Sequence, residues 1–174
     1  MSAAPGAPAP AVRPPVHAVY AGTFDPVTLG HEDMIRRAAR LSDRLVVAVA
    51  RGHHKKTLFS FEERVAMVRE AAAGEPRIEV RALDGLLKDF VGAIGANVLV
   101  RGMRSATDFD YELQMGGINR ILMPSVEILF LMPSDETRFI SGTYVREIAR
   151  LGGPLERFVS PAVQERLRRK LAEG

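Results

Sequence analysis

Four loops along the chain carry residue types that suit binding of phosphate groups. The first, residues 22–31, combines Gly22 and Gly30 with His31 at the start of a predicted helix. Free N–H groups and the positive end of the helix dipole favour an anion there. The same dipole disfavours protonation of the imidazole, so we expect His31 to be a neutral hydrogen-bond donor to a phosphoryl oxygen. A simple capping or packing role for His31 is the alternative.

The second loop, residues 51–56, is basic. Lys55 and Lys56 could reach an anionic substrate, although a solvated loop would have the same composition. His53 and His54 are adjacent, which is poor spacing for two ligands of one metal ion, so we predict no zinc site here.

The third loop, residues 101–104, places Arg101 and Arg104 around a glycine and a methionine. Buried guanidinium groups are costly unless they meet anions, and their forked geometry matches phosphate. Acidic residues follow at Asp108 and Glu112. These acids either favour the N-terminal end of their helix or fix the arginines or a ligand.

The fourth loop, residues 138–146, has small hydroxyl residues at a predicted helix start. Backbone N–H groups and side-chain oxygens in such a segment can surround a phosphate, but an ordinary N-cap has the same sequence. Neither G-x-G-x-x-G nor the Walker A pattern occurs, which argues against a nicotinamide dehydrogenase and a P-loop kinase.

The segments between these loops predict alternating strands and helices. Apolar runs predict strands at 16–20, 45–50, 77–82, 97–100 and 127–132. Helical spacing and capping signals predict helices at 34–41, 60–73, 87–94, 108–123 and 141–150, and a last one from 160. The alternation of strands and helices along the chain predicts a Rossmann-like, doubly wound α/β domain with a five-stranded parallel sheet and helices on both faces. Ligands of such sheets bind beyond the carboxyl ends of the strands, where the four loops lie.

The composition fits one domain. The chain has 174 residues, of which 1–15 are rich in proline and alanine and read as a disordered tail before a domain at 16–174. The absence of cysteine excludes a disulfide framework, a thiolate zinc site and a cysteine nucleophile. No apolar run approaches the roughly 20 residues of a membrane span. No secretory signal is evident, so we expect a cytoplasmic protein. The net charge of +3 suits an anionic small substrate.

Two motifs resemble those of the nucleotidylyltransferase superfamily, T/H-x-G-H within 22–31 and I-S-x-T-x-x-R at 140–146. Further segments resemble the bacterial phosphopantetheine adenylyltransferase family, namely FEER at 61–64, RGMR at 101–104, DFDYE at 108–112, NR at 119–120 and LMPS at 131–134. The resemblance covers about residues 16–172. The chain departs from the family pattern at Ala21, Leu29, Asp110 and Gly142, where proline, asparagine, glutamate and a hydroxyl residue are common.

The resemblance implies transfer of the adenylyl group of ATP to 4′-phosphopantetheine, which yields dephospho-coenzyme A and pyrophosphate. It implies Mg²⁺ with the triphosphate, a homohexamer, and no nucleic-acid or membrane partner; protein ligands of the metal are not predicted. Catalytic roles fall to His31, Lys55 and Arg104. The implied phosphopantetheine contacts are Thr23, Lys55, Leu87 and Arg101. The implied ATP contacts are Thr23, Phe24, His31, Gly102, Met103, Arg104, Glu112, Thr137, Arg138, Phe139, Ile140, Ser141, Gly142 and Thr143.

The residue types agree with this chemistry. The attacking phosphate oxygen is already anionic, so no protein base is required. Two anions must be brought together, and positioning with electrostatic stabilisation should carry the catalysis.

Three alternatives remain open at the level of sequence. A related nucleotidylyltransferase could use another phosphorylated acceptor such as nicotinate mononucleotide. A nucleic-acid-binding module would explain the basic cluster near the C-terminus, although the solvated face of an amphipathic helix explains it as well. The chain could also be a catalytically inactive member of a complex. The cluster consists of Arg166, Arg168, Arg169 and Lys170.

Overall fold

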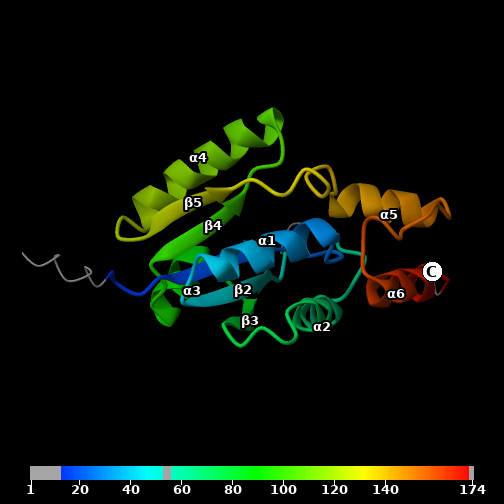
Figure 1. The fold of residues 1–174 in the computed structure, drawn as a ribbon, viewed down its shortest axis with the longest axis horizontal. Helices are drawn as coiled ribbons and strands as arrows, with labels where there is room; N and C mark the ends of the chain where they lie inside the picture. The colour runs from blue at the N-terminus through cyan, green and yellow to red at the C-terminus, as the bar shows by residue number, and fades with distance from the viewer. Residues whose placement is uncertain (1–12, 53–55, 173–174) are drawn as a thin grey trace, which may run out of the picture.

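A sheet of five parallel strands lies at the centre of the computed structural model, which describes residues 13–52 and 56–172 (Figure 1). The strands are β1 (His17–Gly22), β2 (Arg44–Ala50), β3 (Ile78–Leu83), β4 (Val98–Gly102) and β5 (Glu127–Leu131). Their order is β3-β2-β1-β4-β5. The chain therefore changes direction across the sheet between β1 and β4, and the carboxyl ends of these two strands form the switch point where ligands of such folds bind.

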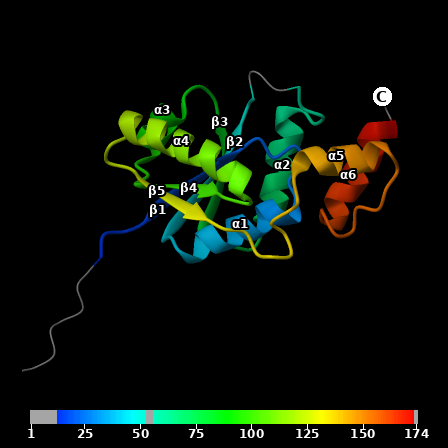
Figure 2. The ribbon, with the colours of Figure 1, turned by 90° about the horizontal axis from the view of Figure 1, so that it is seen from above.

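In the described part of the chain, six helices connect and cover the strands. They are α1 (Leu29–Arg40), α2 (Phe61–Ala71), α3 (Leu87–Ile94), α4 (Ala106–Leu122), α5 (Gly142–Arg150) and α6 (Pro161–Ala172). Figure 2 shows α3 and α4 on one side of the sheet and α1 on the other, with α5 and α6 beyond one end. The predicted Rossmann-like, doubly wound α/β fold is confirmed.

Alternating side chains of the strands build a core on each face of the sheet. In β2, Leu45 and Val47 belong to the larger core, with α1, α2 and α6, whereas Val46 and Ala48 belong to the smaller core, with α3. The nearly continuous apolar run of this strand is thus explained by burial on both faces.

The first helix begins five residues before the apolar spacing that marked it from residue 34, and its first turn contains His31 as the first loop indicated. The helix begins at Leu29, because Thr28 and His31 form a reciprocal cap in which each side chain accepts a hydrogen bond from the other residue's backbone N–H. His31 consequently lies in the first turn of α1. The helix predicted from residue 60 is confirmed as α2, which begins with a capping box of Ser60 and Glu63.

The predicted tail at 1–15 lies largely outside the described residues, as do His53, His54 and Lys55. The last residues of this segment are described and are attached to the domain, because Arg13 forms a bidentate ion pair with Asp43 in which both distances are 2.9 Å. None of the helices in the described part of the chain is long and apolar enough to cross a membrane.

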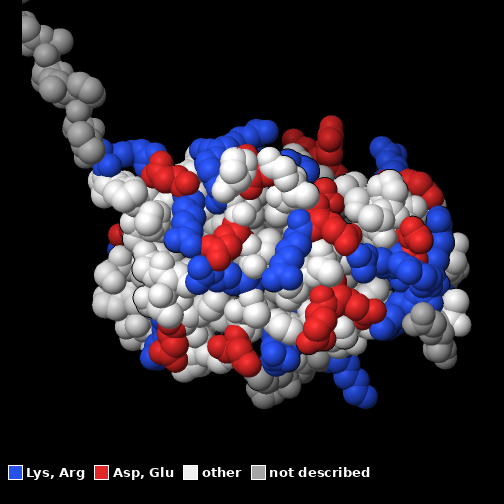
Figure 3. Space-filling view, turned by 90° about the horizontal axis from the view of Figure 1, so that it is seen from below, with Lys and Arg blue, Asp and Glu red and all other residues white. Residues whose placement is uncertain are grey.

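The basic cluster on α6 lies among acidic side chains. Figure 3 shows positive and negative groups interspersed over this face, with basic ones gathered at the end where α6 lies. Arg166 contacts Glu70 at 2.5 Å and Lys170 contacts Glu63 at 3.0 Å. These pairs favour the interpretation as a charged helix face over a nucleic-acid surface.

Candidate active site

Two adjoining pockets open at the carboxyl ends of β1 and β4. The inner pocket, of about 200 Å³, lies between the end of β1, the end of β4 and the first turn of α1. The outer pocket, of about 270 Å³, lies between the loop after β1 and the first turn of α5. His31 and Arg104 line both pockets, so the two hollows share one border.

The structure brings most of the predicted site residues to these pockets. The inner pocket is lined by the predicted residues His31, Arg101, Gly102, Arg104, Glu112, Thr137 and Ile140. The outer pocket is lined by the predicted residues Thr23, Phe24, His31, Arg104, Ser141, Gly142 and Thr143. A third, more apolar hollow beside them is lined by Met103, Arg104 and Arg138.

Three predicted residues lie elsewhere or outside the described residues. Leu87 is at the start of α3 and packs against the smaller core, so it lines none of these pockets. Phe139 is 73% exposed and lies under the guanidinium of Arg138. Lys55 is outside the described residues, but its neighbour Lys56 lines the outer pocket.

His31 is held by the start of its own helix. The backbone N–H of Thr28 donates to its Nδ1 at 3.1 Å, and the ring of Phe24 meets it edge-on with 5.1 Å between ring centroids. Burial, with a smaller contribution from the charge of Arg104, lowers the pKa of His31 to about 4. The lowered pKa agrees with the neutral imidazole expected from the sequence, and burial is its largest cause.

The tautomer of His31 follows from its partner. A backbone N–H can only donate, so Nδ1 must carry the lone pair and the ring proton must be on Nε2. We infer that the side chain offers Nε2–H as a donor to a ligand oxygen.

The acidic residues of α4 fix the arginines of the third loop. Glu112 contacts Arg101 at 2.6 Å, and both side chains are largely buried. Asp108 contacts Arg104 at 2.9 Å. Of the two interpretations offered by the sequence, the structure supports fixation of the arginines, which orients two guanidinium groups at the inner pocket.

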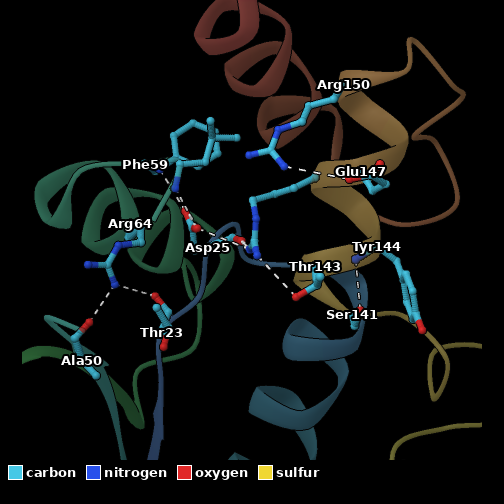
Figure 4. Close-up of polar contacts among 12 residues, drawn as sticks. Thr23, Asp25, Ala50, Phe59, Arg64, Ser141, Thr143, Tyr144, Glu147 and Arg150 are labelled. Atoms are coloured by element: carbon cyan, nitrogen blue, oxygen red, sulfur yellow. Dashed lines mark hydrogen bonds and ion pairs between the residues drawn. The ribbon is translucent and has the colours of Figure 1, made fainter. Parts of the chain in front are cut away.

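A buried carboxylate joins three loops around the outer pocket. Asp25 accepts from the backbone N–H groups of Leu58 at 2.8 Å and Phe59 at 2.9 Å, and it lies 3.4 Å from the guanidinium of Arg146 (Figure 4). Arg146 also donates to the backbone oxygen of Asp25 and, at 3.3 Å, to the hydroxyl of Thr143. The loops after β1, β2 and β5 are therefore held together at one point.

Close backbone approaches explain two glycines of the site. A Cβ at Gly30 would lie 3.2 Å from the backbone oxygen of Thr137, and one at Gly142 would lie 3.1 Å from that of Asp25. Asp33 of α1 also accepts from the backbone N–H of Ser134 at 2.9 Å. The first turn of α1 and the loop after β5 are packed directly against each other, which places the hydroxyls of the fourth loop near His31.

Sequence reasoning gave no role to several residues of the site. Asp25, Thr28 and Arg146 belong to the recognised motifs, so their presence there was the available signal. Tyr20 lines the inner pocket and is a strand residue with no local signal of its own. Burial raises the pKa of Tyr20 to about 12, so its hydroxyl stays protonated.

The hydrogen-bond donors around the pockets suit the oxygens of a phosphorylated ligand. Among the residues that the structure describes, no three histidine, aspartate or glutamate side chains could hold a metal ion together. Asp25 and Glu112, which line the pockets, already bind Arg146 and Arg101. The protein surroundings thus supply donors to phosphate oxygens and no carboxylate cage.

Known proteins share this sequence and fold. The cytidylyltransferase-like family model matches residues 19–148. The phosphopantetheine adenylyltransferase of Acidovorax sp. (strain JS42) is 58% identical over 156 residues, which are 90% of this chain and 94% of that protein. That of Cupriavidus taiwanensis is 53% identical over 158 residues, which are 91% and 98%.

A solved structure supports the fold alone. The chain is similar, with a TM-score of 0.66, to a structure from Vibrio parahaemolyticus described as a nicotinate-nucleotide adenylyltransferase. The identity is 13%, and the match covers 91% of this chain and 93% of the other.

Proposed function

The chain belongs to the phosphopantetheine adenylyltransferase family, and we propose that it transfers the adenylyl group of ATP to 4′-phosphopantetheine. The observation that carries the site assignment is that His31 and Arg104 border both pockets. A triphosphate and a second phosphorylated substrate can therefore meet at one pair of donors. This reaction yields dephospho-coenzyme A and pyrophosphate.

The proposed mechanism relies on positioning and charge. An oxygen of the acceptor phosphate attacks the α-phosphorus of ATP, the bond to the bridging oxygen breaks, and pyrophosphate leaves with the electron pair. Nε2–H of His31 and the guanidinium of Arg104 donate to the phosphoryl oxygens as charge moves through the transition state. Because the nucleophile is an anion, no group of the protein has to accept a proton.

We assign binding roles in accordance with the sequence motifs. Thr23, Lys55 and Arg101 would bind the acceptor, and the hydroxyls and N–H groups of residues 141–143 would bind the triphosphate. The contact of Leu87 with the acceptor and that of Glu112 with ATP stay predictions from the resemblance. Mg²⁺, when bound to ATP oxygens and water, would neutralise part of the triphosphate charge.

We further propose that the chain forms a homohexamer in the cytoplasm, as the resemblance implies. Support for self-association comes from the exposed apolar side chains of α4, which a monomer would leave in contact with water. These are Phe109, Leu113, Ile118, Ile121 and Leu122.

The activity is tested by incubating the purified chain with ATP, Mg²⁺ and 4′-phosphopantetheine and measuring product masses. We expect dephospho-coenzyme A and pyrophosphate in equal amounts. A parallel reaction with nicotinate mononucleotide as the acceptor tests the related activity named for the Vibrio structure. Product from nicotinate mononucleotide alone would contradict the proposal, as would the absence of product from both acceptors.

A further inference from the structure

Arg64 is a buried cation for which the proposed mechanism has no role. It lies in the first turn of α2 and is 1% exposed. One terminal nitrogen donates to the backbone oxygens of Thr23 and Ala50, each at 2.7 Å (Figure 4). The other donates to the backbone oxygen of Arg51 at 2.9 Å. No carboxylate among the described residues lies within ion-pair distance of it.

The three carbonyl groups belong to the exits of two neighbouring strands. Thr23 directly follows β1, Ala50 ends β2, and Arg51 follows it. The strands pair in parallel with Gly22 opposite Val49, so their carboxyl ends are side by side. One planar guanidinium group thus sets the separation of the two loops that begin there.

The far end of the second loop is fixed as well. Asp25 accepts from the backbone N–H groups of Leu58 and Phe59, as described above. At the near end, Arg64 joins the backbone oxygen of Arg51 to that of Thr23. Both ends of the segment that carries Lys56 are therefore tied to the loop after β1.

Arg64 does more than fill space in the core. Burial of a cation costs several kcal/mol, and an apolar side chain would avoid that cost but would leave three carbonyl oxygens without this donor. The guanidinium also has an Nε with no hydrogen-bond partner in the described part of the chain. What the arginine provides, and an apolar side chain does not, is a fixed geometry of three carbonyl groups.

We propose that Arg64 is a positioning residue for the acceptor substrate. It holds Thr23 and Lys56, which line the outer pocket, at the separation at which they bind the acceptor phosphate together. This inference rests on the proposed function. Within the described part of the chain, the hydrogen bonds of Arg64 go to the exits of β1 and β2, so its effect should fall on the acceptor more than on ATP.

The test compares Arg64→Met and Arg64→Lys with Arg69→Met, which removes an exposed arginine of the same helix. We expect Arg64→Met to raise KM for 4′-phosphopantetheine about tenfold or more, a loss typical of misplaced binding groups, with KM for ATP changed less than threefold. Arg64→Lys should recover part of this loss, because an ammonium group can reach one or two of the carbonyls. Arg69→Met should match the wild type.

The outcomes separate this inference from the proposed function. A wild-type chain that makes no dephospho-coenzyme A contradicts the function itself. Unchanged KM values in a folded Arg64→Met variant, or equal increases for both substrates, would show a structural role only. If Arg64→Met does not fold, Arg64→Lys decides, because a wild-type KM for the acceptor in that variant overturns the proposal.

Discussion

His31 shows how one hydrogen bond sets the chemistry of a side chain. Its Nδ1 is occupied by the backbone N–H of Thr28, and its ring lies against Phe24. Protonation would place a positive charge in a buried site near the charge of Arg104. It would also remove the lone pair with which Nδ1 accepts this hydrogen bond. The same contacts that begin α1 therefore keep a neutral donor at the border of the two pockets.

The protonation state of His31 is directly measurable. With a pKa of about 4, the folded protein keeps this imidazole neutral while an unfolded chain protonates it below about pH 6.5. We expect ¹⁵N NMR to report the Nε2–H tautomer throughout pH 5.5–8, and the denatured chain in urea to titrate in that range. A native His31 that titrates near pH 6.5 would contradict this assignment.

Loss of the His31 donor should affect turnover more than folding. We expect His31→Ala to lower kcat by roughly a hundredfold or more, a typical loss for one positioned donor at a transition state. The control is His17→Ala, because His17 lies at the amino end of β1, away from the pockets. Steady-state kinetics of both variants tests this role, and circular dichroism confirms that they fold. Near-normal turnover of His31→Ala would contradict the assignment of His31 as a transition-state donor.

At the scale of elements, local patterns predicted the strands and most helices, because apolar periodicity and caps are local signals. The cap of α1 was not recognised in the sequence, because the partner of Thr28 is a histidine, whereas the usual capping box has glutamate or glutamine. The contacts of Asp25 and Arg64 join loops that are far apart in sequence, so no local pattern indicated them.

Because Asp25 joins separate loops, its loss should lower the free energy of unfolding. Asp25→Ala leaves two backbone N–H groups without this acceptor and removes the carboxylate that faces Arg146. We expect the free energy of unfolding to fall by about 3–5 kcal/mol, as for other broken buried pairs. Asp135→Ala is the matched control, because Asp135 pairs with Arg138 at the surface and its side chain is 94% exposed.

Chemical denaturation of the two variants decides the point. A surface pair such as Asp135 with Arg138 contributes at most about 1 kcal/mol. Equal losses in the two variants would mean that Asp25 does not hold the loops together.

At the scale of the whole molecule, the sequence could not tell a core face of α4 from an interface. Phe109 and Leu113 lie four residues apart on one side of this helix, and the structure leaves both about half exposed. Ile121, farther along the helix, is 81% exposed. Figure 2 shows α4 on the outer side of the sheet, so a second copy of the chain has access to this surface.

Burial of the α4 face between copies should disappear when a charge is placed on it. We expect the wild type to have about six times the chain mass of 19.1 kDa and Ile121→Glu to form smaller species, because a buried unpaired carboxylate costs several kcal/mol. Leu41→Glu is the control, since Leu41 is exposed at the end of α1. Sedimentation velocity measures all three. A monomeric wild type, or an Ile121→Glu variant with the wild-type mass, would contradict self-association through α4.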